Sequence, residues 1–267
     1  MKQISILGCG WLGLPLAKSL LEQGFSINGS TTSLDKIPIL KDAGITPFQI
    51  SLFEDKVEGA MDLFLENSGI LIVDIPPKLR GDSKENFVGK IESLIPFIEN
   101  STVKKVLFVS STSVFSDDNS EVTEASIPNP DTESGKQLLE SEQLLQSNKN
   151  FQTTIIRFGG LIGRDRHPIK FLARIKNIEN PDAPINLIHQ DDCIGIIETL
   201  INLDLWNEIF NAVAPIHPTR KEYYTQKTIE LNLPLPEFEE GKISKGKLIS
   251  SIKVKTILNY KFKRELL

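Results

Sequence analysis

The chain has 267 residues, of which 40% are hydrophobic and 24% charged, and its formal net charge at pH 7 is −5. A chain of this length can bury a full core as one domain, or as one domain with an appendage. The acidic balance argues against a general nucleic-acid binder, and apolar runs such as residues 69–73 are too short to span a membrane. The first strand is expected near residue 3, which leaves no room for a signal peptide. We therefore expect a cytoplasmic protein with no nucleic-acid or membrane partner.

Strand-like and helix-like segments alternate through the first 160 or so residues. Apolar runs predict strands over residues 2–7, 25–30, 45–50, 70–73, 106–110 and 153–158. Helical spacing predicts helices over residues 11–23, 33–44, 84–99 and 131–145. This alternation is typical of an α/β protein with a Rossmann-type doubly wound parallel sheet.

Prolines and shorter elements dominate the chain after about residue 159, although residues 192–203 still predict a helix. We interpret residues 1–163 as an NAD(P)-binding Rossmann domain. Residues 164–267 are then a smaller, mostly C-terminal α+β substrate-binding region. The boundary is interleaved, because segments 185–188 and 209–212 are both candidates to rejoin the main sheet.

A glycine-rich turn follows the first strand and opens a helix, with the sequence Gly8-Cys9-Gly10-Trp11-Leu12-Gly13. In a dinucleotide-binding turn the first glycine permits the tight bend, the second lets the backbone approach the pyrophosphate, and the third lets helix and strand pack closely. The free N–H groups of the helix N-terminus then face the phosphates. This context predicts a dinucleotide site, and the alternative is a glycine-rich turn without a ligand.

The end of the second strand bears on the choice of cofactor. An NAD-specific fold places an acid there, about 20 residues after the turn, for the ribose 2′-hydroxyl. Here Ser30, Thr31 and Thr32 occupy that place, and the next acid is Asp35. Hydroxyls and Lys36 suit a 2′-phosphate better than an acid would, so we favour NADP(H), with NAD(H) as the open alternative. The hydroxyls could instead only form a turn and cap the next helix.

Five further segments occur in an order typical of one family. Residues 109–115 resemble an SSxxVYG stretch, 128–140 a PxxxYxxxKxxxE helix, 157–163 an RxxxxxG segment, 186–192 a (V/I)HVDD stretch and 208–211 a strand ending in YN. With the glycine-rich turn, they resemble the extended, NAD-dependent epimerase/dehydratase-like branch of the short-chain dehydrogenase/reductase superfamily over nearly the whole chain. More narrowly, the chain resembles an atypical bacterial group that lacks the catalytic tyrosine.

That resemblance implies a reactive Ser–Tyr–Lys trio. In the family, the phenol exchanges a proton with the substrate while hydride moves to or from nicotinamide, and the lysine holds the nicotinamide ribose. Carried over, the serine is Ser111 and the lysine is Lys136, but Thr132 stands where the tyrosine belongs. An aliphatic hydroxyl is a far weaker acid than a phenol, which titrates near pH 10. Thr132, a histidine or bound water would therefore have to relay the proton.

The resemblance and the turn together nominate the cofactor-binding residues Gly8, Gly10, Trp11, Leu12, Gly13, Ser30, Thr31, Thr32, Ile75 and Lys136. Arg164, Arg166 and His167 follow the sixth strand, and His189 lies in the HVDD-like stretch; we expect these four to bind substrate. Asp191 and Asp192 are expected to cap the following helix. The histidines show no ligand spacing, so no metal site is expected.

These observations predict an NAD(P)-binding epimerase/dehydratase-like oxidoreductase that acts on a small hydroxylated substrate, with an anionic group on that substrate as an open alternative. The missing tyrosine keeps a second hypothesis open, a catalytically impaired dinucleotide-binding sensor or regulatory protein of the same fold. A homodimer through the helices predicted over residues 84–99 and 131–145 also remains open.

Overall fold

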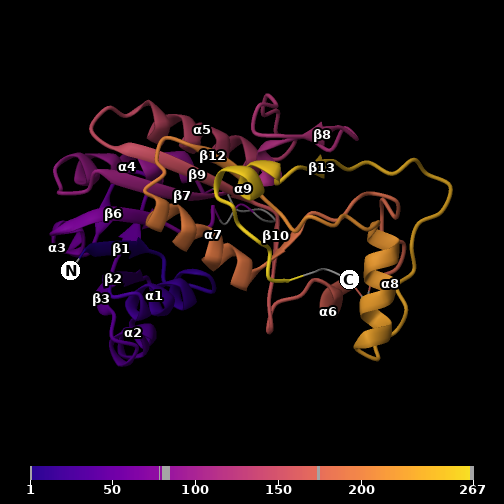
Figure 1. The fold of residues 1–267 in the computed structure, drawn as a ribbon, viewed down its shortest axis with the longest axis horizontal. Coiled ribbons are helices and arrows are strands. Elements are labelled where there is room, and N and C mark those ends of the chain that lie inside the picture. Colours follow the sequence, from indigo (N-terminus) through magenta and orange to yellow (C-terminus); the bar gives the residue numbers. More distant parts are fainter. Residues whose placement is uncertain (1, 78, 80–84, 173–174, 265–267) are drawn as a thin grey trace.

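The computed structural model describes residues 2–77, 79, 85–172 and 175–264. Within them, a seven-stranded sheet in the order β12-β9-β7-β6-β1-β2-β3 forms the centre of the molecule, and all its strands run parallel (Figure 1). In chain order the strands are β1 (Gln3–Leu7), β2 (Ser26–Thr31), β3 (Thr46–Gln49), β6 (Ser68–Val73), β7 (Lys105–Ser111), β9 (Gln152–Phe158) and β12 (Ile209–Ala212). The predicted Rossmann-type doubly wound sheet is confirmed.

The strand order reverses at β1. The chain first moves outward from β1 to β2 and β3, then returns to the other side of β1 with β6 and moves outward again. Ligands of open α/β sheets bind beyond the carboxyl ends of the strands at such a switch point. The topology therefore places a ligand crevice where β1 and β6 end.

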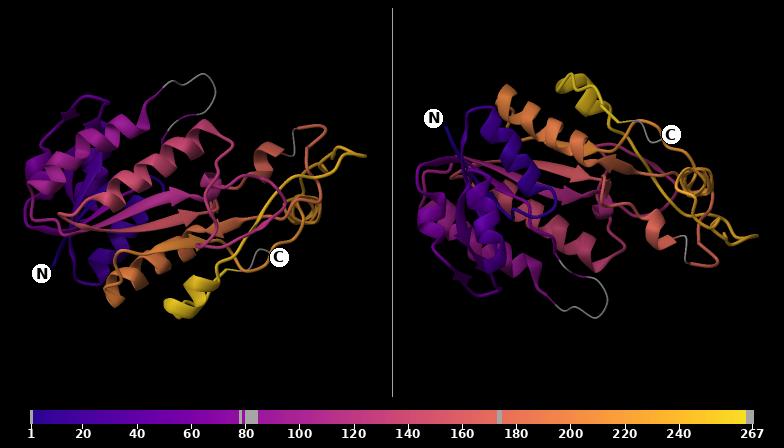
Figure 2. Two further views of the ribbon diagram at one scale, coloured as in Figure 1. Left: turned by 90° about the horizontal axis from the view of Figure 1, so that it is seen from above. Right: turned by 90° about the horizontal axis from the view of Figure 1, so that it is seen from below.

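Helices cover both faces of the sheet (Figure 2). One face carries α1 (Gly13–Glu22), α2 (Ile37–Asp42), α7 (Gln190–Leu203) and α9 (Ile252–Ile257), whose buried side chains share one hydrophobic cluster. The other face carries α3 (Met61–Leu65), α4 (Phe87–Glu99) and α5 (Glu133–Ser147), which share a second cluster. Burial on both faces explains why strands such as β6 read as continuous apolar runs.

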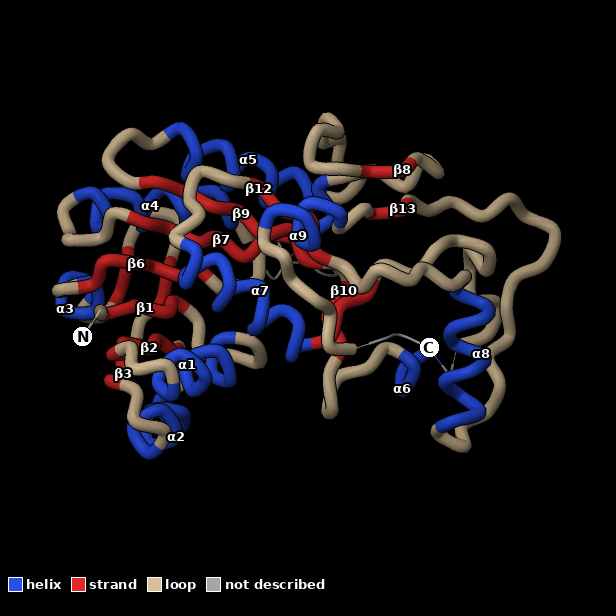
Figure 3. The backbone as a smooth tube through the Cα atoms, in the orientation of Figure 1, coloured by secondary structure: helices blue, strands red, loops and turns tan. Residues whose placement is uncertain are grey.

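A smaller lobe extends beyond the carboxyl ends of the strands (Figure 3). It contains α6 (Ile169–Leu172) and α8 (Arg220–Glu230), and a third hydrophobic cluster that includes Ile169 and Tyr223. Nearby, β10 (Gly160–Ile162) pairs with β11 (Leu187–His189), and β8 (Glu121–Val122) pairs with β13 (Leu248–Ile249). A short hairpin of β4 (Ser51–Leu52) and β5 (Val57–Glu58) follows β3.

The two ambiguous segments of the sequence separate in the structure. Residues 209–212 join the main sheet as β12, whereas the strand within 185–189 pairs with β10 instead. Both α7 and β12 therefore belong to the main sheet and its helix layers, although they follow residue 163. The domain division at 163/164 stays a prediction. The helix predicted over residues 84–99 begins at Phe87, with Asn86 as its N-cap, and residue 84 lies outside the described residues. No helix among the described residues is long and apolar enough to cross a membrane.

Candidate functional site

The glycine-rich turn connects β1 to α1 at the switch point. Gly8 has a φ of +108°, and a Cβ atom on it would lie 2.3 Å from the carbonyl oxygen of Asp74. A Cβ atom on Gly13 would lie 2.2 Å from the carbonyl oxygen of Gly8, whereas one on Gly10 would meet nothing within 4 Å. A side chain on Gly8 or Gly13 would therefore collide with a backbone carbonyl oxygen, whereas Gly10 faces open space. This is the distribution of roles that a dinucleotide turn needs.

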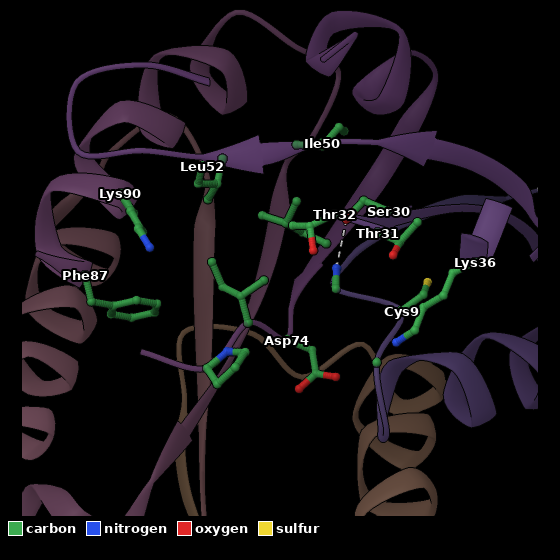
Figure 4. A pocket seen from close by; sticks show the side chains of 15 residues that line it. Cys9, Ser30, Thr31, Thr32, Lys36, Ile50, Leu52, Asp74, Phe87 and Lys90 are labelled. Carbon is green, nitrogen blue, oxygen red and sulfur yellow. Dashed lines mark hydrogen bonds between the residues drawn. The ribbon is translucent and has the colours of Figure 1, made fainter. Parts of the chain in front are cut away.

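A cavity opens in front of this turn (Figure 4). Six of the predicted cofactor-binding residues line it, namely Gly8, Gly10, Ser30, Thr31, Thr32 and Ile75. The other lining residues include Cys9, Lys36, Asp74, Phe87 and Lys90, with Lys90 and Phe87 on one side of the cavity and Lys36 on the other. The structure therefore brings the turn and the end of the second strand together as expected.

The hydroxyls at the end of β2 have local partners. Ser30 Oγ accepts a hydrogen bond of 2.9 Å from the N–H of Gly8, which fixes the turn to β2. Thr31 Oγ1 accepts one of 3.1 Å from the N–H of Ser33, so this hydroxyl also forms the turn that the sequence left as an alternative. Thr32 is exposed. Lys90, a cation that the sequence did not single out, forms an ion pair with Glu85 at the cavity edge.

Asp74 is the acidic residue among those that line the cavity within the described chain. It follows β6 directly, and a Cβ atom on Gly13 would lie 3.1 Å from its Oδ2. Burial raises the pKa of Asp74 to about 8, although the Gly13 N–H and the guanidinium of Arg166 act in the opposite direction. Burial also raises the pKa of the Cys9 thiol to about 12, so this thiol is not a nucleophile near neutral pH. The sequence signal for Asp74 was an acid immediately after a buried strand.

Trp11 and Leu12 support the turn and do not line the cavity. Leu12 is buried in the core. Trp11 lies against the loop after β10, where its Nε1 donates to Asp165 Oδ1 at 2.9 Å and the Arg166 guanidinium lies 5.0 Å from a ring centroid. Gln190 also donates to the Trp11 carbonyl oxygen at 2.6 Å. The loop after β10 and the start of α7 therefore contact the turn through Trp11 and stabilise it.

The expected catalytic trio lies at the end of β7 and the start of α5. Ser111 Oγ accepts from the N–H of Ser113 at 3.1 Å. Thr132 is the N-cap of α5, where its Oγ1 accepts from the N–H of Gly135 at 3.1 Å. A Cβ atom on Gly135 would lie 2.2 Å from the carbonyl oxygen of Ser113, so the start of α5 packs directly on the turn after β7.

Lys136 lies in this first turn of α5 and is exposed. The packing of α5 on the turn after β7 brings the segments of the trio together. However, Ser111, Thr132 and Lys136 do not line the cavity in front of the glycine-rich turn.

A buried ion pair lies behind this segment, and sequence reasoning missed it. Arg157 Nε donates to the two carboxylate oxygens of Glu142 at 3.0 and 3.1 Å, and Ser110 Oγ donates to Oε1 at 2.6 Å. The side chains of Arg157 and Glu142 are 3% and 1% exposed. The motif resemblance pointed to Glu140 as the helix acid, but Glu140 is exposed and the buried carboxylate lies two residues later.

The four expected substrate residues do not gather at one place. Arg166 lies on Trp11, while Arg164 is exposed in the loop after β10. His167 Nδ1 accepts from the N–H of Ile169 at 3.1 Å, so in this tautomer its Nε2–H donates to the Tyr223 hydroxyl at 2.8 Å. His167 thus packs into the small lobe.

His189 caps α7, because its Nδ1 accepts from the N–H of Asp191 at 3.1 Å. The expectation that Asp191 and Asp192 cap this helix is wrong. The carboxylate of Asp192 is buried and accepts from the Tyr260 hydroxyl at 3.0 Å and from the N–H of Lys263 at 2.6 Å. It ties the C-terminal segment to α7. Within the described residues no group of three or more His, Cys, Asp or Glu side chains could hold a metal ion.

Comparisons with known proteins give related sequences and related folds. No family model matches the chain. The chain is 32% identical to protein YeeZ of Escherichia coli over 264 residues. The match covers 98% of this chain and 96% of that protein.

The structure superimposes on UDP-glucuronic acid 4-epimerase of Bacillus cereus in complex with NAD, with a TM-score of 0.82 at 15% identity, over 99% of this chain and 94% of that one. It also superimposes on UDP-N-acetylglucosamine 4-epimerase of B. cereus, with a TM-score of 0.77 at 16% identity, over 100% of this chain and 95% of that one. At these identities the likeness concerns the fold.

Proposed function

The chain belongs to the family of protein YeeZ and has the fold of the extended short-chain dehydrogenase/reductases, and on this premise we propose that it is an NAD(P)-binding, epimerase/dehydratase-like oxidoreductase. The observation that carries the proposal is the open space in front of Gly10, at the switch point of a doubly wound sheet. A side chain at that position would fill the place where a pyrophosphate approaches the backbone. We further propose a small hydroxylated substrate, which fits the sugar nucleotides named for the two epimerases.

The residues of the turn fit the parts of a dinucleotide. The N–H groups at the start of α1 would hold the pyrophosphate, and the end of β2 would lie at the ribose that bears the adenine. A bound nicotinamide supplies a hydride donor or acceptor. Ser111, at the carboxyl end of β7, would orient the substrate oxygen, and Lys136 would hold the nicotinamide ribose. Arg164 would contribute a donor for a substrate anion.

We propose NADP(H) as the preferred cofactor, with NAD(H) as the alternative. Ser30, Thr31 and Thr32 supply no carboxylate for a ribose 2′-hydroxyl, and Lys36 and Lys90 line the same cavity. Lys36 favours a 2′-phosphate over a hydroxyl, whereas Lys90 lies on the other side of the cavity (Figure 4) and already pairs with Glu85. The hydrogen bond that occupies the Thr31 hydroxyl does not weaken this argument, because the argument depends on charge.

A specific observation favours the second function, a dinucleotide-binding sensor or regulatory protein without turnover. The Thr132 hydroxyl, at the tyrosine position, caps α5. Burial raises the pKa of each of the chain's tyrosines, Tyr223, Tyr224 and Tyr260, so none of these phenols is tuned toward neutral pH. A proton relay by a phenol is therefore not available from the described tyrosines.

Thr132→Tyr distinguishes the two functions. In an enzyme of the family's usual chemistry, a phenol beside Lys136 raises reduction of NADP⁺ or NAD⁺ with UDP-sugar substrates, because the sugar hydroxyl gives a hydride to the nicotinamide and its proton to the phenolate, by ~10²–10⁴-fold. Thr132→Phe is the matched control, since it has the ring without the O–H and should show no gain. Dinucleotide binding without turnover in all three proteins would favour the regulatory function. A protein that binds neither NADPH nor NADH would contradict both.

We also propose a homodimer formed through α4 and α5, which pack side by side on one face of the sheet. Sedimentation equilibrium of the wild-type protein tests this, and a monomer mass at all concentrations would contradict it. A cytoplasmic location remains part of the proposal, and it is supported by the free thiols of Cys9 and Cys193, both buried.

A further inference from the structure

A carboxyl group lines the cavity in which the proposed cofactor would place its phosphates. Asp74 follows β6 at the switch point and lines the same cavity as Gly8 and Gly10 (Figure 4). Gly13 is the first residue of the ten-residue helix α1, and its N–H lowers the pKa of Asp74. A Cβ atom on Gly13 would lie 3.1 Å from Asp74 Oδ2, which shows how closely the carboxyl group approaches the helix end.

A pyrophosphate needs the same N–H groups. The N-terminus of a helix attracts anions through its free N–H groups and its dipole. An ionised carboxylate at this end would compete for those donors and would repel a second anion at short range. A protonated carboxyl group has neither effect, and its O–H can donate to a phosphate oxygen.

The charged and titratable groups around Asp74 come from several elements. Arg166, in the loop after β10, is the cation that acts on it, and Lys36 and Lys90 line the wider cavity. Cys9 in the turn and Cys193 on α7 also face it, and burial keeps both thiols neutral over the physiological range. Burial raises the pKa of Asp74 to about 8 in spite of Arg166 and the Gly13 N–H. Near neutral pH, the group that faces the phosphate site is therefore largely the neutral acid.

We propose that Asp74 takes part in dinucleotide binding as a neutral carboxyl group that donates its O–H to the pyrophosphate, and that its ionisation weakens binding. The inference rests on the proposed function. A bound pyrophosphate makes loss of the Asp74 proton still less favourable, so the complex keeps this proton to a higher pH than the free protein does. Affinity is then constant below about pH 8 and falls above it, by up to about tenfold per pH unit, until the complex also ionises.

The test is a fluorescence titration of wild-type protein with NADPH from about pH 7 to about pH 9.5, where a phosphate monoester with a second pKa near 6 stays fully ionised. NADH replaces NADPH as the probe if it binds more tightly at neutral pH. Wild-type affinity should fall by up to about tenfold per pH unit above about pH 8. Asp74→Asn keeps a donor of similar shape without the charge, so its affinity should stay flat and exceed that of wild type at the alkaline end.

Asp35→Asn is the matched control. It removes a carboxylate from an exposed residue of the 3₁₀ turn next to the cavity and should keep the wild-type slope. Calorimetry in buffers of different ionisation enthalpy measures the second signature, proton uptake on binding that is near zero around pH 7 and approaches one proton at alkaline pH. Thermal unfolding verifies that Asp74→Asn is folded.

The outcomes separate this inference from the function on which it rests. NADPH or NADH binding with a flat profile in wild type, or with the same slope in wild type and Asp74→Asn, overturns the role of Asp74 and leaves the proposed function standing. Absence of binding by either dinucleotide at every pH, in wild type and in Asp74→Asn, overturns both.

Discussion

At the residue scale, two side chains at the end of β2, Ser30 and Thr31, have a structural partner as well as a place in the cavity. Ser30 fixes Gly8, and Thr31 holds the N–H of Ser33. The sequence predicted that these residues lie near the cofactor, because the end of the second strand follows the turn in every fold of this type. The sequence left open whether the hydroxyls contact a cofactor or only form a turn. In the structure the same residues form the turn and line the cavity.

Thr31→Asp should reverse the cofactor preference. Aspartate can still accept the hydrogen bond from Ser33, and its charge repels a 2′-phosphate while accepting a bond from a 2′-hydroxyl. We expect the wild type to bind NADPH more tightly than NADH. The variant should bind NADPH at least about tenfold more weakly than the wild type does. Calorimetric titration with both dinucleotides measures this. Thr31→Asn, without the charge, should keep the wild-type order, and a wild-type preference for NADH would show that the end of β2 does not select the phosphate.

Glu142 and Arg157 illustrate a residue-level feature that the sequence did not reveal. Positions two apart in a helix face different directions, so Glu140 and Glu142 cannot both point to the sheet. The motif resemblance selected Glu140, whereas packing selected Glu142. Which acid is buried depends on the side chain that β9 presents opposite it, and this is a long-range contact.

Glu142→Gln should destabilise the fold strongly, by about 3–5 kcal/mol, because it leaves the Arg157 guanidinium buried without a counter-charge. Urea unfolding measures the loss. The double variant Glu142→Gln with Arg157→Met should regain much of it, since the unpaired charge is then gone. A single-variant loss below about 1 kcal/mol would mean that Arg157 reaches water or another acid.

At the element scale, the helix starts decide several of the expected roles. The sequence predicted helices at 131–145 and 192–203, and α5 and α7 occupy these places with starts that differ by two residues. Thr132 and His189, expected in the catalytic and substrate sites, are the caps that set these starts. Serine and threonine caps are readable from sequence, but here the family position of Thr132 drew attention to chemistry instead.

Thr132→Ala should lower the free energy of unfolding by about 1 kcal/mol, while Thr132→Ser should leave it nearly unchanged, because serine keeps the cap. If Thr132 only caps α5, any turnover should be the same in both variants once they are folded. Loss of turnover in Thr132→Ala that Thr132→Ser restores would instead assign the hydroxyl a part in proton transfer. Urea unfolding and steady-state assays on the two variants measure both quantities.

At the scale of the whole molecule, the sequence predicted the layers and the position of the turn. Each strand of a parallel sheet is a separate apolar run followed by a helix, so local pattern is enough to identify the doubly wound fold. It did not distinguish β11 from β12, since both are short apolar runs and only their partners differ. Asp74 was missed although it directly follows a buried strand, because its approach to Gly13 is a contact between distant parts of the chain.

The glycines of the turn offer a control at this scale, because they respond differently to a side chain. Gly13→Ala brings a Cβ atom into the Gly8 carbonyl oxygen, so it should disturb the fold itself. Gly10→Val meets no protein atom within 4 Å of its Cβ position, so its melting temperature should match that of wild type. The effect of Gly10→Val on binding can therefore be separated from an effect on folding.

The most direct test of the account is a calorimetric titration of NADPH and NADH into wild-type protein and Gly10→Val. We predict that wild type binds at least one dinucleotide, and that Gly10→Val loses this binding while it unfolds at the wild-type temperature, because the valine side chain fills the place of the pyrophosphate. Unchanged affinity in a folded Gly10→Val variant would contradict the claim that the glycine-rich turn is the cofactor site.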